Sequence, residues 1–245
     1  MGLVWSLLIV DPLIVLSTIF CGLIGMILSL FEERGHSQVK VARAWARSIL
    51  RFAGVRVTAE GLEKIEPQGS YVFIANHLSY MDTPVVLSKI PVQFRFLAKK
   101  GLFQIPLLGS HLARAGHIPV PRGDPRAAVK SLSLAAETIR EHGISVLIFP
   151  EGGRSADGAL HPFKEGAAYI AIKAGVPAVP VAITGTREVM AMGSATIHRG
   201  NVHLRIGDPI PTADLTLRDR QALTEAVREQ IVKMTHTAES LTPSW

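Results

Sequence analysis

The stretch Tyr71–Asp82, YVFIANHLSYMD, decides the fold of this 245-residue chain. Its first five residues are an apolar run, which is typical of a β-strand. An Asn-His pair follows directly, and Asp82 stands before a Thr-Pro pair of the kind that begins a helix. The stretch therefore predicts a strand, a polar turn and a helix, which is the repeating unit of an α/β domain.

The same alternation continues along the chain. Apolar runs predict strands at Val55–Val57, Tyr71–Ala75, Phe94–Ala98, Ser145–Phe149, Ala178–Ile183 and Val202–Ile206. Helical spacing predicts helices at Thr83–Lys89, Ala127–His142, Glu165–Ala174 and Leu217–Ala238. We expect one layered α/β domain with a mixed sheet over residues 54–245, preceded by a membrane segment.

The N-terminus is the most apolar part of the chain. Pro12–Phe31 is a run of 20 residues without a charge, about the length that a helix needs to cross a bilayer. Met1–Val10 is also apolar and is separated from that run only by Asp11, so a single membrane helix and a helical hairpin within one leaflet both fit. Because the N-terminus lacks Lys and Arg, we expect residues 1–35 to be retained and not cleaved as a signal peptide.

Residues 36–53 predict a second membrane contact. Lys40, Arg43, Arg47 and Arg51 recur there at helical spacing, opposite an apolar face. Such a helix fits a membrane surface, and basic residues after an apolar helix indicate the cytoplasmic side, where anionic lipids attract them. The alternative is a helix whose apolar face packs on the domain while its basic face is solvated.

The amino-acid composition limits the classes of partner that the chain is suited to bind. A net charge of +6 and a pI near 9.7 suit nucleic acid, an anionic membrane or an acidic substrate. Nucleic acid is disfavoured because the basic residues follow a membrane segment and lack interleaved aromatic residues. The single cysteine, Cys21, excludes a disulfide framework and a cysteine-rich metal site, and the nine histidines lack metal-ligand spacing such as H-x-x-x-H.

His77 and Asp82 are the first candidate site residues. On one helix a five-residue offset would turn them about 140° apart, so they can meet only across a strand-to-helix turn. A carboxylate bonded to one imidazole nitrogen leaves the other nitrogen ready to take a proton from an alcohol. No nucleophilic Ser or Cys pattern is present, so the attacking hydroxyl would belong to the substrate. The alternative is that Asp82 only caps the helix that follows it.

Basic residues in four further segments are candidates for binding an anion. In FPEGGRS the glycines allow close approach of backbone amides, and Arg154 supplies a forked donor suited to phosphate. The alternative is an ordinary glycine turn with Arg154 paired to Asp157. In GHIPVPR Arg122 follows a short extended segment, Lys100 follows a predicted strand, and Lys164 precedes a predicted helix; each basic residue alone is typical of a solvated charge.

Together these segments resemble the four motif blocks of the glycerolipid acyltransferases, and most closely those of the bacterial 1-acyl-sn-glycerol-3-phosphate (lysophosphatidic acid) acyltransferases. The matching residues, in the family's order, are Asn76-His77 with Asp82, Gly116–Arg122, Phe149–Ser155 and Val179–Val181. The resemblance covers residues 54–211. One departure is Gly153, which stands where the family usually has threonine.

The resemblance implies transfer of a fatty acyl group from a thioester, acyl-CoA or acyl carrier protein, to 1-acylglycerol 3-phosphate (lysophosphatidic acid), giving phosphatidic acid for phospholipid biosynthesis. It implies His77 as general base and Asp82 as its orienting partner. It also implies that the substrate is bound by Lys100, Arg122, Glu151, Gly152 and Arg154. No metal and no cofactor beyond the thioester co-substrate are expected.

The expected location is the cell inner membrane, in contact with anionic lipid, with the active site on the cytoplasmic face. Two alternatives remain open. The acceptor could be another lysolipid, either a lysophospholipid with a larger head group or a lyso-aminolipid, with Gly153 as the sequence feature at issue. The other alternative is a non-enzymatic protein that binds membrane lipid.

Overall fold

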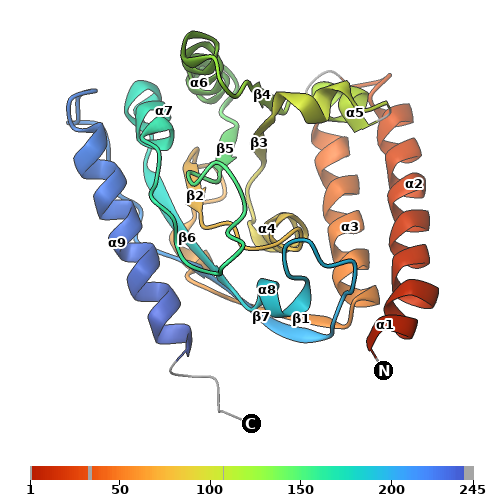
Figure 1. The fold of residues 1–245 in the computed structure, drawn as a ribbon. Coiled ribbons are helices and arrows are strands. Elements are labelled where there is room, and N and C mark those ends of the chain that lie inside the picture. Colours follow the sequence, from red (N-terminus) through yellow and green to blue (C-terminus); the bar gives the residue numbers. More distant parts are fainter. Residues whose placement is uncertain (1, 33–34, 107, 240–245) are drawn as a thin grey trace.

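The predicted strand at the start of YVFIANHLSYMD is β2, and it lies in the middle of a mixed sheet (Figure 1). The computed structural model describes residues 2–32, 35–106 and 108–239, so the ends of the predicted segments 1–35 and 54–245 lie partly outside it. Seven strands in these residues form the sheet in the order β1-β7-β6-β2-β5-β3-β4. Their bounds are β1 Val55–Glu60, β2 Val72–Ala75, β3 Phe94–Lys99, β4 Ile118–Val120, β5 Ser145–Ile148, β6 Ala178–Thr184 and β7 Gly200–Ile206.

Strands β2 to β6 run parallel to one another, and β7 pairs antiparallel to β6 while β1 runs parallel to β7. Helices cover both faces because alternate side chains of a strand point to opposite sides. In β2, Phe73 packs into the core on the side of α3 and α4, whereas Val72 and Ile74 pack on the side of α6, α7 and α9. These helices are α3 (His36–Phe52), α4 (Asp82–Lys89), α6 (Pro125–His142), α7 (Gly166–Ala174) and α9 (Arg220–Glu239).

The predicted elements are all present, with ends shifted by up to three residues. The extended segment before Arg122 is β4. The sequence did not predict the short elements η2 (Leu62–Lys64), η3 (Lys100–Gln104), α5 (Leu108–Arg114) and α8 (Thr186–Val189). Elements of three to seven residues contain too few turns to show a hydrophobic period, so pattern analysis passes over them.

The N-terminal segment is one continuous helix. It consists of α1 (Gly2–Trp5), a π-helical segment η1 (Ser6–Val10) and α2 (Asp11–Leu28). Pro12, the second residue of α2, comes just after the π-helical turn, and the helix continues through it. Of the two alternatives, the structure therefore has the single helix and not a hairpin within residues 2–28. Within the described part of the chain, one helix, Ser6–Leu28, has the length and apolar composition to cross a membrane.

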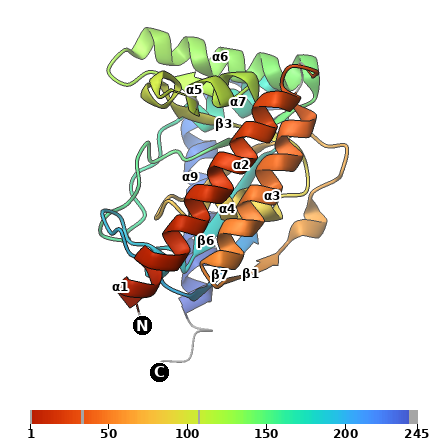
Figure 2. The same cartoon turned by 90° about the vertical axis from the view of Figure 1, so that its right-hand side faces the viewer.

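Helix α3 runs beside α2 (Figure 2) and turns its apolar face toward the domain. Val39, Ala46, Ile49 and Leu50 are buried. One guanidinium nitrogen of Arg43 donates to the carbonyl oxygens of Ile90, Pro91 and Val92, at 2.8, 2.9 and 2.8 Å, just past the end of α4. The apolar face thus packs on the domain, and Lys40, Arg47 and Arg51 remain exposed. Contact of this helix with a membrane surface stays a prediction.

Candidate active site

The candidate active site lies where the parallel strands end. His77 follows β2, Lys100 follows β3, Arg122 follows β4, Glu151 follows β5 and Thr186 follows β6. These five strands are neighbours in the sheet and point the same way. Their following loops therefore meet at one edge, which is where α/β domains build their sites.

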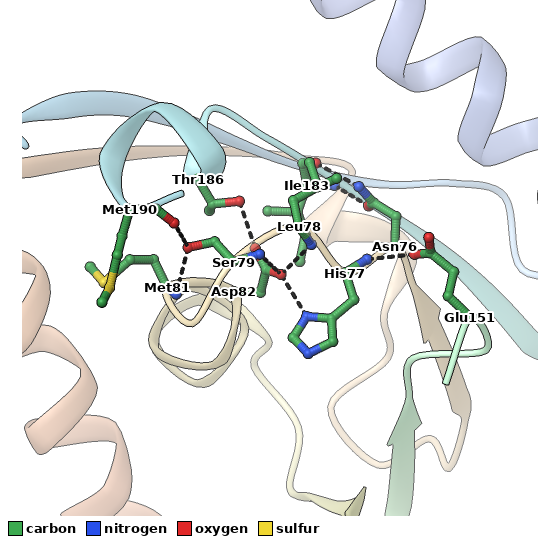
Figure 3. A network of polar contacts seen from close by, with 10 residues as sticks. All are labelled: Asn76, His77, Leu78, Ser79, Met81, Asp82, Glu151, Ile183, Thr186 and Met190. Carbon is green, nitrogen blue, oxygen red and sulfur yellow. Dashed lines mark hydrogen bonds and ion pairs between the residues drawn. The ribbon is translucent and has the colours of Figure 1, made fainter. Parts of the chain in front are cut away.

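The predicted His77–Asp82 pair is formed across the strand-to-helix turn (Figure 3). His77 Nδ1 lies 2.7 Å from Asp82 Oδ2. The Asp82 side chain is fully buried, and His77 retains 9% of its surface. The second ring nitrogen of His77 points away from the other residues drawn in Figure 3. The carboxylate therefore fixes the imidazole and leaves Nε2 to react.

Asp82 is not a simple helix cap. Its Oδ2 also accepts hydrogen bonds from the backbone N–H groups of Leu78 and Ser79, at 2.7 and 2.9 Å, and both residues precede α4. Its Oδ1 accepts from the hydroxyl of Thr186 at 2.6 Å. A buried carboxylate with four donors is well satisfied. The contacts support the interpretation of Asp82 as the partner of His77 and not the helix-cap alternative.

The loop that carries the pair is tied to β6 and to the chain that follows β6. The Asn76 side chain donates to the carbonyl of Ile183 at 2.8 Å and accepts from its N–H at 2.7 Å. The Ser79 hydroxyl donates to the carbonyl of Met190 at 2.7 Å. These bonds hold residues 76–82 in one position relative to the sheet (Figure 3).

Glu151 supports His77 from the other side. Its Oε1 accepts the backbone N–H of His77 at 2.7 Å, and its Oε2 accepts the backbone N–H of His161 at 3.0 Å. Burial raises the pKa of Glu151, while the two N–H donors oppose that shift. Two positions before Glu151, the ring of Phe149 stacks on the imidazole of His77 with centroids 3.9 Å apart. Glu151 therefore has contacts typical of a residue that positions the base, whereas the sequence interpretation gave it a substrate contact.

Arg122 and Gly152 are in contact. The Arg122 guanidinium donates to the carbonyl oxygen of Gly152. Gly152 has φ +75°, which favours glycine, and a Cβ there would lie 2.7 Å from Lys164 Nζ. The absence of a side chain thus admits Lys164 to the turn whose carbonyl oxygen Arg122 contacts.

Arg154 completes the cluster. Its guanidinium lies over the ring of Tyr80, 3.7 Å from the centroid, and its Nε has no hydrogen-bond partner among the described residues. The alternative pairing with Asp157 is not formed, since that carboxylate accepts from Ser155 and pairs with His161. Burial lowers the pKa of Arg154, while Tyr80 and Asp82 oppose that shift and the charge of Arg122 adds to it.

Among the predicted site residues, hydrogen bonds join Asp82 and Glu151 to His77. Arg122 contacts Gly152, and Arg154 lies over the ring of Tyr80. Lys100 is exposed at the start of η3, and no described contact links it to His77 or Arg154. The structure adds Tyr80 and Thr186, for which the sequence gave no signal.

The polar side chains at this edge of the sheet that could bind a ligand are cationic. Within the described residues, no group of three His, Cys, Asp or Glu side chains could hold a metal ion. Arg122, Arg154 and Lys164 surround the Gly152 turn, and guanidinium groups suit the bidentate recognition of phosphate. The site therefore combines a base with an adjacent region suited to an anionic group.

Comparisons with known proteins show which family the chain resembles. Residues 56–184 match the family model described as Acyltransferase. The chain is 39% identical over 172 residues to the chloroplastic 1-acyl-sn-glycerol-3-phosphate acyltransferase of Brassica napus, covering 69% of this chain and 49% of that protein. It is 28% identical over 214 residues to the human alpha form of that enzyme, covering 87% and 76%. The chain spans about half the length of the Brassica relative.

The fold has a solved counterpart. The crystal structure of the 1-acyl-sn-glycerophosphate (LPA) acyltransferase PlsC from Thermotoga maritima matches with a TM-score of 0.82 and 26% identity, over 99% of this chain and 98% of that chain. The match extends over the N-terminal helices as well as the sheet. The predicted α/β class is confirmed.

Proposed function

The chain belongs to the acyltransferase family, and we propose that it transfers a fatty acyl group from a thioester to 1-acyl-sn-glycerol 3-phosphate, giving phosphatidic acid. The observation that carries the proposal is the His77–Asp82 pair beside the cationic cluster of Arg122 and Arg154. The printed names of the relatives and of the solved structure describe enzymes of the same reaction.

The proposed chemistry is a direct transfer. His77 Nε2 takes the proton of the lysolipid hydroxyl as that oxygen attacks the thioester carbonyl. The new C–O bond forms, the C–S bond breaks, and the imidazolium returns its proton to the leaving thiolate. Asp82, bonded to Nδ1, holds the required tautomer and stabilises the imidazolium between these steps.

The cationic cluster would select the acceptor. A phosphate bound by Arg122 and Arg154 fixes which hydroxyl of the glycerol reaches His77, so that binding also determines positional selectivity. Gly152 supplies the turn that brings these groups together. Lys100, at the same sheet edge, is proposed as a further phosphate contact, and Glu151 as a positioning residue.

We also propose that the site faces the cytoplasmic surface of the inner membrane. Helix α2 exposes a run of large apolar side chains: Leu13, Val15, Leu16, Ile19, Phe20, Leu23 and Ile27. On the neighbouring α3, Arg47 and Arg51 are exposed, and with Lys89 they line a surface hollow of about 380 Å³. An apolar helix next to exposed cations suits an anionic bilayer surface, from which a lysolipid can reach the site. The thioester donor, acyl-CoA or acyl carrier protein, would arrive from the aqueous side.

The test is acyl transfer by the full chain in vesicles. Labelled acyl-CoA and acyl carrier protein are offered with lysophosphatidate, a larger-headed lysophospholipid, a lyso-aminolipid and monoacylglycerol. We expect transfer to lysophosphatidate, loss of transfer in His77→Ala, and little use of monoacylglycerol. Faster transfer to another lysolipid would make that lipid the acceptor in place of lysophosphatidate. The absence of turnover with every acceptor would favour the alternative of a non-enzymatic lipid-binding protein.

Arginine variants test the phosphate contact separately. Arg154→Lys keeps the charge but removes the fork, so KM for lysophosphatidate should rise about tenfold with a smaller change in kcat. The matched control is Arg126→Lys, on the exposed first turn of α6, which should leave both constants unchanged. An unchanged KM in Arg154→Lys would contradict the assignment.

A further inference from the structure

Thr186 lies outside the four motif blocks, yet it contacts the His77–Asp82 pair. It opens α8, directly after β6, and its side chain is fully buried. Its hydroxyl lies 2.6 Å from Asp82 Oδ1, across 104 positions of sequence. Figure 3 shows this bond on the side of the carboxylate that faces away from His77.

The two oxygens of Asp82 have different partners. Oδ2 accepts from His77 Nδ1 and from the N–H groups of Leu78 and Ser79, all in its own loop. Among the described residues, Oδ1 has one hydrogen-bond donor, the Thr186 hydroxyl. Loss of that hydroxyl would leave a buried anionic oxygen without a donor, which is costly enough to turn the carboxylate or to favour its protonation. Either change weakens the bond that fixes the imidazole.

We propose that Thr186 is a positioning residue for the transfer reaction, acting through Asp82 on His77. This inference rests on the proposed function. By occupying Oδ1, the threonine keeps Oδ2 directed at His77 Nδ1 and so keeps Nε2 unprotonated and ready to accept the substrate proton. Thr186 does not touch the substrate in this scheme.

Neighbouring contacts make the effect of the hydroxyl separable from that of the fold. Asn76 with Ile183 and Ser79 with Met190 connect the same two segments on either side of Thr186. These bonds remain when the hydroxyl alone is removed. A Thr186→Val substitution therefore changes the carboxylate's surroundings while the two segments stay joined.

The first experiment compares Thr186→Val, Thr186→Ser and the control Thr184→Val. Thr184 ends β6, two positions away, and none of its described contacts reaches Asp82. We expect Thr186→Val to lower kcat roughly tenfold to a hundredfold, with both KM values within about twofold. Thr186→Ser should restore kcat to within about threefold, because it keeps the donor. If Thr186→Val does not fold, Thr186→Ala, which adds no bulk, takes its place.

The second experiment places Thr186→Val in an Asp82→Ala background. If the threonine acts through the carboxylate, the residual rate does not fall further. A further loss there, or an unchanged kcat in the single variant, would overturn the proposal. A wild-type chain inactive on every lysolipid would instead defeat the proposed function, so the two failures are distinguishable.

Discussion

Two histidines lie at opposite ends of one row of aromatic rings, in opposite electrostatic surroundings. His77 stacks on Phe149 at 3.9 Å between centroids, Phe149 lies 6.5 Å from Phe96, and Phe96 lies 5.5 Å from His117. The two imidazoles therefore share the same apolar row but have different polar neighbours.

The neighbours determine what each imidazole can do. His77 faces the carboxylate of Asp82. The Nδ1 of His117 instead accepts the backbone N–H of Phe96 at 3.0 Å, so this ring is neutral when bonded. His117 keeps some exposed surface, but enclosure of its ring lowers its pKa to about 3, and the charge of Arg95 adds to the shift. A carboxylate neighbour suits His77 to act as a base, whereas enclosure, together with a guanidinium neighbour, keeps His117 neutral.

The largest expected effect separates the two histidines directly. His77→Ala should lower kcat about a thousandfold or more, because it removes the general base. His117→Asn, which offers an oxygen to the N–H of Phe96, should leave kcat within about threefold. Transfer of labelled acyl groups to lysophosphatidate measures both. Equal rates for wild type and His77→Ala would show that His77 is not the general base, and the contrast between the two histidines would fail.

The next effect concerns Phe149, whose ring stacks on the imidazole of His77. Phe149→Leu removes the stacked face while keeping an apolar side chain, and we expect kcat to fall about tenfold as His77 gains freedom. Phe96→Leu, one ring farther away, is the matched control and should reduce kcat less than about threefold. A larger loss of kcat in Phe96→Leu would mean that the whole row of aromatic rings, and not the contact between Phe149 and His77, controls the rate.

A smaller effect concerns stability against pH. The lowered pKa of His117 means that the unfolded chain binds a proton below about pH 6.5 while the folded chain does not until about pH 3. This contribution is therefore fully present above pH 6.5 and is lost as the pH falls toward 3, by up to about 1 kcal/mol per pH unit. The Tm of His117→Asn should fall less than that of wild type between pH 7 and pH 5. Parallel curves would show that the ring takes up a proton in the folded state.

The smallest effect is expected at Gly153, where the family usually has threonine. A Cβ at this position would meet no atom within 4 Å, and the backbone does not require glycine. Gly153→Thr should change the free energy of unfolding by only about 0.5 kcal/mol. Competition between lysolipid acceptors measures any change in acceptor preference. A changed preference would show that the turn at Gly153 contacts the acceptor head group near His77.

Local sequence predicted much of the site. His77 and Asp82 belong to one strand-turn-helix unit, so their meeting followed from chain geometry, and Arg122 and Arg154 followed from residue type and order. Thr186 could not be predicted, because its partner lies 104 positions away and α8 is too short to show a pattern. Tyr80 was also missed, because the approach of Arg154 to its ring depends on two loops meeting.

By itself, the sequence determined the strands and long helices, the presence of a long apolar run at the N-terminus and the residue types at the sheet edge. These depend on periodicity and local sterics, which a linear chain displays directly. The tertiary structure decided what each surface faces. It packed the apolar face of α3 on the domain and joined residues 2–28 into one helix. It also brought Thr186 to Asp82 and placed Arg95 beside His117. The physical reason is that burial and charge act between groups brought together in space, and their separation along the chain does not encode that proximity.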